Sequence, residues 1–205
     1  MEPGQGEERP RGSLDLGAGR LEAFSDAVMA VIITIMAFEL HAPEAPTIDA
    51  LREALPGLFV YVLSFAFVAI YWNNHHHLLR ATDRISGAVM WANMLLLFWL
   101  SLIPVVTEWL STDHQYRSAL PAASYGVVAL AAAVSYTILV RALIRANGPT
   151  SFVGTAIASD RKGLLSLAMY AAGVLLAGVS PWISYGLYAA VAVVWWIPDR
   201  RFSRR

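Results

Sequence analysis

Long stretches without a formal charge alternate along this chain with short segments in which charged residues gather. Four stretches contain no Asp, Glu, Lys or Arg: residues 54–79, 85–107, 118–140 and 163–198. Each of the first three is long enough for one helical crossing of a membrane, which needs about 20 apolar residues. The fourth holds 36 residues and is interrupted near Gly178-Val-Ser-Pro181, which predicts two short crossings joined by a tight turn. With a further apolar helix after Arg20, the pattern predicts an all-α, polytopic membrane protein with six transmembrane helices, kinked in the third span at Pro104.

The composition agrees with a membrane protein. Hydrophobic residues make up 57% of the chain and charged residues 15%, whereas charged residues alone reach about 25% of a soluble domain. Cysteine is absent, which excludes disulfides and thiolate metal sites. No phosphate-binding glycine loop, His-Glu-x-x-His metal motif or Gly-x-Ser-x-Gly nucleophile motif occurs, so the sequence predicts neither an enzyme nor a resident cofactor.

Basic residues are sorted to one side of the expected topology. The segment before the first span, the loops after the second and fourth spans and the C-terminal tail hold 13 of the 15 basic residues, whereas the other loops hold only Arg52 and Arg117. The positive-inside rule therefore predicts a cell-membrane protein with both termini in the cytoplasm. Lipid headgroups account for this charge, and nothing indicates a nucleic-acid partner. We expect one transmembrane domain at 19–198, between a disordered tail at 1–18 and a basic tail at 199–205.

The first helix carries charge where a passive anchor would have none. Only twelve uncharged residues separate Asp26 from Glu39. At about 1.5 Å per residue they cover roughly 18 Å of a hydrocarbon core about 30 Å thick. At least one carboxylate must therefore lie at membrane depth or in a hydrated vestibule, which is costly unless the charge is paired or hydrated. This arrangement indicates that the helix is the working part of a membrane transport protein.

Ala27, Val31, Thr34 and Phe38 form a narrow stripe along one side of this helix. Small and weakly polar residues on one stripe permit close packing of helices within the chain, and periodicity alone favours that interpretation. Alternatively, symmetric copies of the stripe surround an ion path. A ring of Thr34 hydroxyls would then replace part of the water shell of an ion, and a ring of Val31 would form a dewetting constriction. Periodicity does not choose between the two.

Polar residues near the inner end of the first span predict contacts with other helices. Arg20 and Asp26 are about 120° apart around their helix and roughly 9 Å apart along it, so they are poorly placed to pair with each other. Each is expected to find a partner on another helix. Ser25 adds a hydroxyl that can join such a network. A structural clamp that fixes the helix is the favoured role of this network, ahead of direct ion binding.

Three adjacent histidines, His75, His76 and His77, end the second span. They point in different directions on a helix, so no metal site is expected unless other elements supply ligands. Trp72, His75 and His76 share one face at spacing i, i+3 and i+4, on the same side of the membrane as Asp26. We therefore expect a contact between Asp26 and a histidine. Structural hydrogen bonding is the favoured role, and a pH-sensing role is the alternative.

The segment Arg20-x-x-x-Phe24-Ser25-Asp26, followed by Ala-Val-x-Ala-Val-x-x-Thr34, resembles the first-helix signature of the transmembrane protein 175 family of potassium channels. Tyr71-Trp72-Asn-Asn-His75-His76 resembles the second-helix motif of its prokaryotic members. The six spans and the cytoplasmic termini extend this resemblance over nearly the whole chain.

The resemblance implies a homotetramer in which the first helix lines the pore. In that family a hydrophobic constriction and a threonine layer control permeation without a carbonyl filter. Here they are implied at Val31 and Thr34, with Phe38 as a further pore-facing residue and Ala27 on the same stripe. The family often has Ile or Leu where Val31 stands, so the constriction is either wider here or set by Ile35.

By the same resemblance, a polar network holds the pore helix in place. Its members are Arg20, Phe24, Ser25, Asp26, Trp72, His75 and His76. The sequence thus predicts a passive potassium-selective cation channel, with potassium ions and membrane lipid as its partners. The alternatives are a proton-coupled transporter that uses Asp26 and His75 or His76, and a membrane scaffold that transports nothing.

Overall fold

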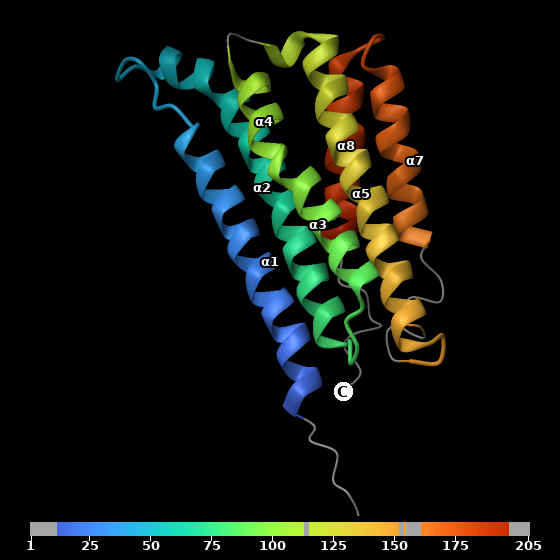
Figure 1. The fold of residues 1–205 in the computed structure, drawn as a ribbon. Coiled ribbons are helices and arrows are strands. Elements are labelled where there is room, and N and C mark those ends of the chain that lie inside the picture. The colour runs from blue at the N-terminus through green and yellow to red at the C-terminus, as the bar shows by residue number, and fades with distance from the viewer. Residues whose placement is uncertain (1–11, 113–114, 152–153, 155–160, 197–205) are drawn as a thin grey trace, which may run out of the picture.

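The uncharged runs form helices that lie side by side in one bundle, as Figure 1 shows. The computed structural model describes residues 12–112, 115–151, 154 and 161–196. Their elements are α1 (Gly12–Phe38), α2 (Ile48–Arg80), α3 (Gly87–Ser101), α4 (Ile103–Ser111), the short 3-10 helix η1 (Gln115–Arg117), α5 (Ala119–Asn147), α7 (Arg161–Leu176) and α8 (Pro181–Trp196). Within these described residues there is no strand, so the all-α prediction is confirmed.

The number of spans also agrees with the prediction. Four helical segments are long and apolar enough to cross a membrane: Gly17–Phe38, Ile48–Arg80, Gly87–Ser111 and Ala119–Asn147. The last uncharged run forms α7 and α8, each 16 residues long, on either side of the turn at residues 177–180. These are the two short helices expected on either side of the break near Gly178, and with the four longer segments they make up the six helices of the prediction.

The third span is interrupted between α3 and α4. Pro104 lies in the first turn of α4, next to the break at Leu102. Because proline has no N–H and its ring crowds the preceding turn, it cannot continue the hydrogen-bond ladder of α3. The predicted kink at Pro104 is therefore present.

Helix α1 begins earlier than the sequence predicted. Residues 12–18 are part of α1, which corrects the expected boundary of a disordered tail at residue 18. Extending an existing helix costs far less than starting one, because each added residue gains a backbone hydrogen bond. The rest of that predicted tail, residues 1–11, and the predicted tail at 199–205 lie outside the described residues.

Helix α5 packs against α3, α4, α7 and α8 and forms the centre of the bundle. Its close approach to α8 depends on Gly126, because a Cβ at this position would collide with the side chain of Tyr188. The Tyr188 hydroxyl donates to the carbonyl of Ala122 at 3.2 Å and fixes the ring in this place. Small residues thus allow two membrane helices to pack with their backbones close together.

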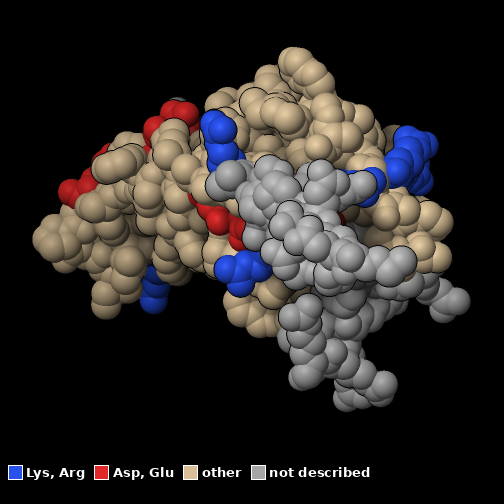
Figure 2. All heavy atoms as spheres, turned by 60° about the horizontal axis from the view of Figure 1, so that its bottom comes forward, with Lys and Arg blue, Asp and Glu red and all other residues tan. Residues whose placement is uncertain are grey.

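Helix α1 lies at one edge of the bundle, where it packs against α2, α3 and α4 (Figure 1). It starts at the lower end of the view, and α8 runs down to the same end (Figure 1). The two described ends of the chain therefore lie on one side, as an even number of crossings requires. Figure 2 views the molecule from this end and shows Lys and Arg side chains spread around it.

Candidate functional site

One side of α1 packs into the bundle and the opposite side is uncovered. Buried side chains recur every three or four residues, at Leu21, Ser25, Met29, Ile32 and Met36. This spacing is the period of one helix face, and it turns that face toward the neighbouring helices of the same chain. The other face of α1 is left to meet something outside the chain.

The predicted stripe lies on the uncovered face. Ala27, Val31, Thr34, Ile35 and Phe38 are all exposed, with 55% of Val31 and 85% of Phe38 accessible. The described helices of the same chain therefore do not cover this stripe. The stripe does not serve to pack α1 against these helices. Either lipid or another copy of the chain must lie against it.

The hydroxyl of Thr34 is oriented by its own helix. Thr34 Oγ1 donates to the carbonyl oxygen of Val31 at 2.8 Å. Because the proton is used in that bond, the lone pairs of the hydroxyl oxygen remain available on an exposed surface. The Thr34 oxygen can therefore act as an acceptor, which is what a partly dehydrated cation needs.

A fully buried chain of hydrogen bonds joins α1 to α2 through α3. Ser25 Oγ donates to the carbonyl of Leu21 at 2.8 Å and accepts from Asn93 Nδ2 at 2.9 Å. Asn93 Oδ1 lies 2.7 Å from His75 Nε2. Ser25, Asn93 and His75 have no exposed surface, so each of these bonds replaces hydration that the buried groups have lost. The chain of bonds fixes how α1 is rotated against its neighbours.

A second group of polar residues lies between α1 and α2. His76 Nδ1 is 2.8 Å from Glu22 Oε1, and Arg80 Nε is 3.4 Å from the same oxygen. The ring of Trp72 stacks on His76, with centroids 5.7 Å apart and planes 26° apart. This group brings His76 and Trp72 together as the i, i+4 spacing predicted, with Glu22 as the acidic partner.

Asp26 lies beside this group. One side-chain ligand atom each from Glu22, Asp26 and His76 lies within 4.8 Å of the other two. The structure thus brings Asp26 close to a histidine, which is His76. Asp26 Oδ1 is nevertheless buried, and no described residue supplies it with a hydrogen bond.

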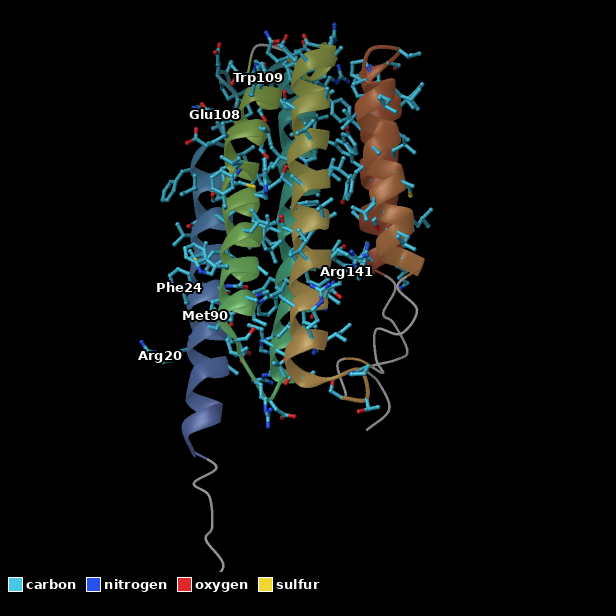
Figure 3. All side chains as sticks on the ribbon, turned by 45° about the vertical axis from the view of Figure 1, so that its right-hand side comes forward. Arg20, Phe24, Met90, Glu108, Trp109 and Arg141 are labelled. Atoms are coloured by element: carbon cyan, nitrogen blue, oxygen red, sulfur yellow. The ribbon has the colours of Figure 1, made fainter. Side chains whose placement is uncertain are left out.

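Two members of the predicted network lie elsewhere. Arg20 and Phe24 are exposed, and Figure 3 shows the Arg20 side chain pointing away from the bundle. The partner expected for Arg20 on another helix is therefore not supplied by the described residues of its own chain. Both side chains belong to the uncovered side of α1, together with the stripe.

Sequence reasoning missed Glu22 and Asn93. Each carried a signal that could have identified it. Glu22 stands four residues before Asp26 and so shares its helix face. Asn93 places an amide inside an otherwise apolar span, where a polar side chain needs a partner on another helix.

Comparison with known proteins places this chain in a family. Residues 20–104 match the family model described as the endosomal/lysosomal potassium channel TMEM175. A potassium channel of Chryseobacterium sp. (strain P1-3) is 45% identical over 186 residues, which cover 91% of this chain and 96% of that protein. This chain belongs to the TMEM175 family. A potassium channel of Streptomyces collinus is 34% identical over 130 residues, which cover 60% of this chain and 62% of that protein.

A solved TMEM175 structure has the same fold. The crystal structure of a lysosomal potassium-selective channel TMEM175 homolog from Chamaesiphon minutus matches with a TM-score of 0.78. The match covers 91% of this chain and 98% of that chain at 24% identity, so the likeness concerns the arrangement of the helices. The segment that matches the TMEM175 model runs from α1 to the start of α4. It therefore contains the uncovered stripe and both polar groups.

Proposed function

We propose that this chain conducts potassium ions passively, in an oligomer whose pore is lined by α1. The observation that carries the proposal is the uncovered stripe, which combines exposed apolar side chains with the exposed Thr34 hydroxyl. The relatives named as potassium channels support a channel rather than an enzyme. A potassium-selective homolog with the same fold adds support to this choice of ion.

The stripe offers two physical devices for selecting an ion. A ring of Val31 side chains, or of Ile35 side chains, would form an apolar constriction at which ions must shed water. Potassium holds its hydration shell less tightly than sodium, so the free energy of dehydration on entering the constriction is smaller for potassium. Thr34 is three residues from Val31, about 4.5 Å along the axis. Its oxygens would replace part of the lost water and favour the ion that dehydrates more easily.

The proposed assembly is a homotetramer in the cell membrane. The exposed side of α1 includes the small residues Ala27 in the stripe and Ala30 beside it, and small residues favour close contact between membrane helices. We place both termini in the cytoplasm on the basis of three arginines. Arg80 ends α2, Arg84 follows it and Arg145 lies in the last turn of α5, all on the side where the described chain ends lie.

An acidic cleft lies at the opposite end of α1 and suits the entry of cations. It has a volume of about 600 Å³, and its lining includes Glu39, Glu44, Asp49 and Glu53. Several carboxylates in one cleft raise the local concentration of cations. In the proposed orientation this cleft faces outward, beyond the end of the stripe at Phe38.

The test is ion flux from liposomes that contain the purified protein. Potassium release is measured with a potassium-sensitive dye, with sodium release as the paired comparison and protein-free liposomes as the control. The proposal predicts potassium flux well above sodium flux, without saturation, and at the same rate with or without an imposed pH gradient.

The same assay separates the alternatives. The closeness of Asp26 and His76 suits proton transfer, so saturable flux that requires a pH gradient would favour a proton-coupled transporter. No flux of either ion from an intact oligomer would favour a scaffold. Equal fluxes of potassium and sodium would support a channel but contradict the proposed potassium selectivity.

A further inference from the structure

Two carboxylates and an imidazole converge where α1 packs against α2. Glu22 and Asp26 are four residues apart on α1, so their side chains are neighbours, and His76 reaches them from α2. One ligand atom of each lies within 4.8 Å of the others, and all three residues are partly buried. We propose that Glu22, Asp26 and His76 bind a divalent transition-metal ion such as Zn²⁺, which links α1 to α2.

The surrounding charges leave one carboxylate without compensation. Glu22 Oε1 is approached by His76 Nδ1 at 2.8 Å and by Arg80 Nε at 3.4 Å. Asp26 Oδ1 is buried and has no hydrogen-bond partner within the part of the chain that the structure describes, which is costly for a charged oxygen. Two carboxylates four residues apart on one helix also repel each other. A divalent cation between them relieves both penalties.

The ligand set determines which cations fit. A neutral imidazole and carboxylate oxygens suit zinc and its neighbours in the first transition row, whereas Ca²⁺ and Mg²⁺ prefer shells made only of oxygen. Zinc binds such atoms at about 2.0–2.2 Å, so the three ligand atoms must move closer together than they now lie. Glu22 has a long side chain and can present Oε2 to the ion while Oε1 keeps Arg80. Water completes a tetrahedral shell around three protein ligands.

The neighbouring residues favour a defined geometry. Trp72 stacks on the His76 ring and restricts its orientation, as the outer shell of a metal site commonly does. Arg80 competes with the metal for Glu22 and is 68% exposed, so it can swing away. Figure 2 shows acidic atoms between basic ones near the middle of this end of the molecule. Binding here does not depend on the permeation path proposed above, because it involves none of the stripe residues.

In the first experiment the full chain is treated with a chelator, purified in detergent and titrated with ZnCl₂. Isothermal titration calorimetry measures the affinity and the number of ions bound per chain. Cobalt absorption in the visible range provides an independent signal. We expect one ion per chain, with Asp26→Asn and His76→Gln each weakening the affinity at least about tenfold. His77→Gln, at the exposed neighbouring histidine, is the matched control and should bind as the wild type does. Arg80→Gln removes the competing cation and should tighten binding.

X-ray absorption spectroscopy of the zinc-loaded wild type identifies the zinc ligands directly. It tests the proposal even if a variant fails to fold. The expected spectrum shows nitrogen and oxygen ligands at about 2.0–2.2 Å with the scattering signature of one imidazole. A zinc shell without imidazole would overturn the proposal. So would wild-type affinity in both the Asp26 and the His76 variants, or equal binding of Mg²⁺ and Zn²⁺.

Discussion

Replacing Asn93 by leucine should destabilise the protein, because Asn93 connects Ser25 of α1 to His75 of α2 through buried hydrogen bonds. Leucine has the same branching pattern as asparagine, so the change removes two hydrogen bonds without opening a large cavity. Ser25 keeps its bond to Leu21 and loses little. His75 loses its partner at Nε2, and its Nδ1 has none among the described residues. These residues would therefore leave a fully buried imidazole without any hydrogen bond.

The expected loss follows from these two effects. Hydrogen bonds between membrane helices contribute on average about 0.6 kcal/mol and at most about 1.7 kcal/mol. A buried polar group without a partner adds about 1–3 kcal/mol. We therefore expect Asn93→Leu to lower the free energy of unfolding by about 2–4 kcal/mol. His75→Phe removes the orphaned group, so the double variant Asn93→Leu/His75→Phe should be more stable than the sum of the two single changes predicts.

The wild type, the two single variants and the double variant are denatured in mixed detergent micelles. Circular dichroism monitors the loss of helix and gives the free energy of unfolding of each. Asn73→Leu is the matched control, because Asn73 is an exposed asparagine on α2. Strictly additive effects of the two single changes would refute the inferred coupling between Asn93 and His75. An unfolding free energy of Asn93→Leu equal to that of the wild type would show that the buried chain of hydrogen bonds does not stabilise this contact.

Three further predictions concern the stripe and the helix packing. Val31→Asn should wet the constriction, raise conductance and reduce selectivity in bilayer recordings, and unchanged currents would remove Val31 from the narrowest point. Thr34→Ala should shift the reversal potential toward weaker potassium preference, because the exposed oxygen is lost; an unaltered potential would show that Thr34 takes no part in selection. Gly126→Ala should lower stability by about 1–3 kcal/mol in thermal unfolding, because the added methyl collides with Tyr188. Gly87→Ala, which meets open space, is the control, and equal melting of both variants would contradict the packing argument.

The spans could be predicted from sequence because their signal is strong and local. A run of about 20 uncharged residues has few alternatives to a membrane helix, and a proline in such a run has few alternatives to a break. Pro104 and the interruption near Gly178 were therefore identified correctly. The start of α1 was not, because residues 12–18 extend an existing helix and need no apolar pattern of their own.

The polar contacts were harder to predict because they depend on how the helices are rotated against one another. The pattern placed Asp26 and the histidines on the same side of the membrane, but it could not show that His75 turns toward Asn93 while His76 turns toward Glu22. Adjacent residues differ by about 100° around a helix, so two neighbouring histidines meet different helices. The same holds for Arg20. The sequence predicted a partner on another helix, but the rotation of α1 turns the Arg20 side chain away from the bundle.

The buried and uncovered faces of α1 depend on each other. Ser25 and Thr34 are nine residues apart, which at 100° per residue places them about 180° apart around the helix. The hydrogen bond that holds Ser25 to Asn93 therefore also directs Thr34 away from the bundle. A half-turn of α1 about its axis would bury Thr34 and expose Ser25. The contact between Ser25 and Asn93 thus sets the angle at which the stripe faces the proposed pore. A helix with such an apolar exposed side therefore gains a fixed orientation from a buried, hydrogen-bonded hydroxyl on its other side.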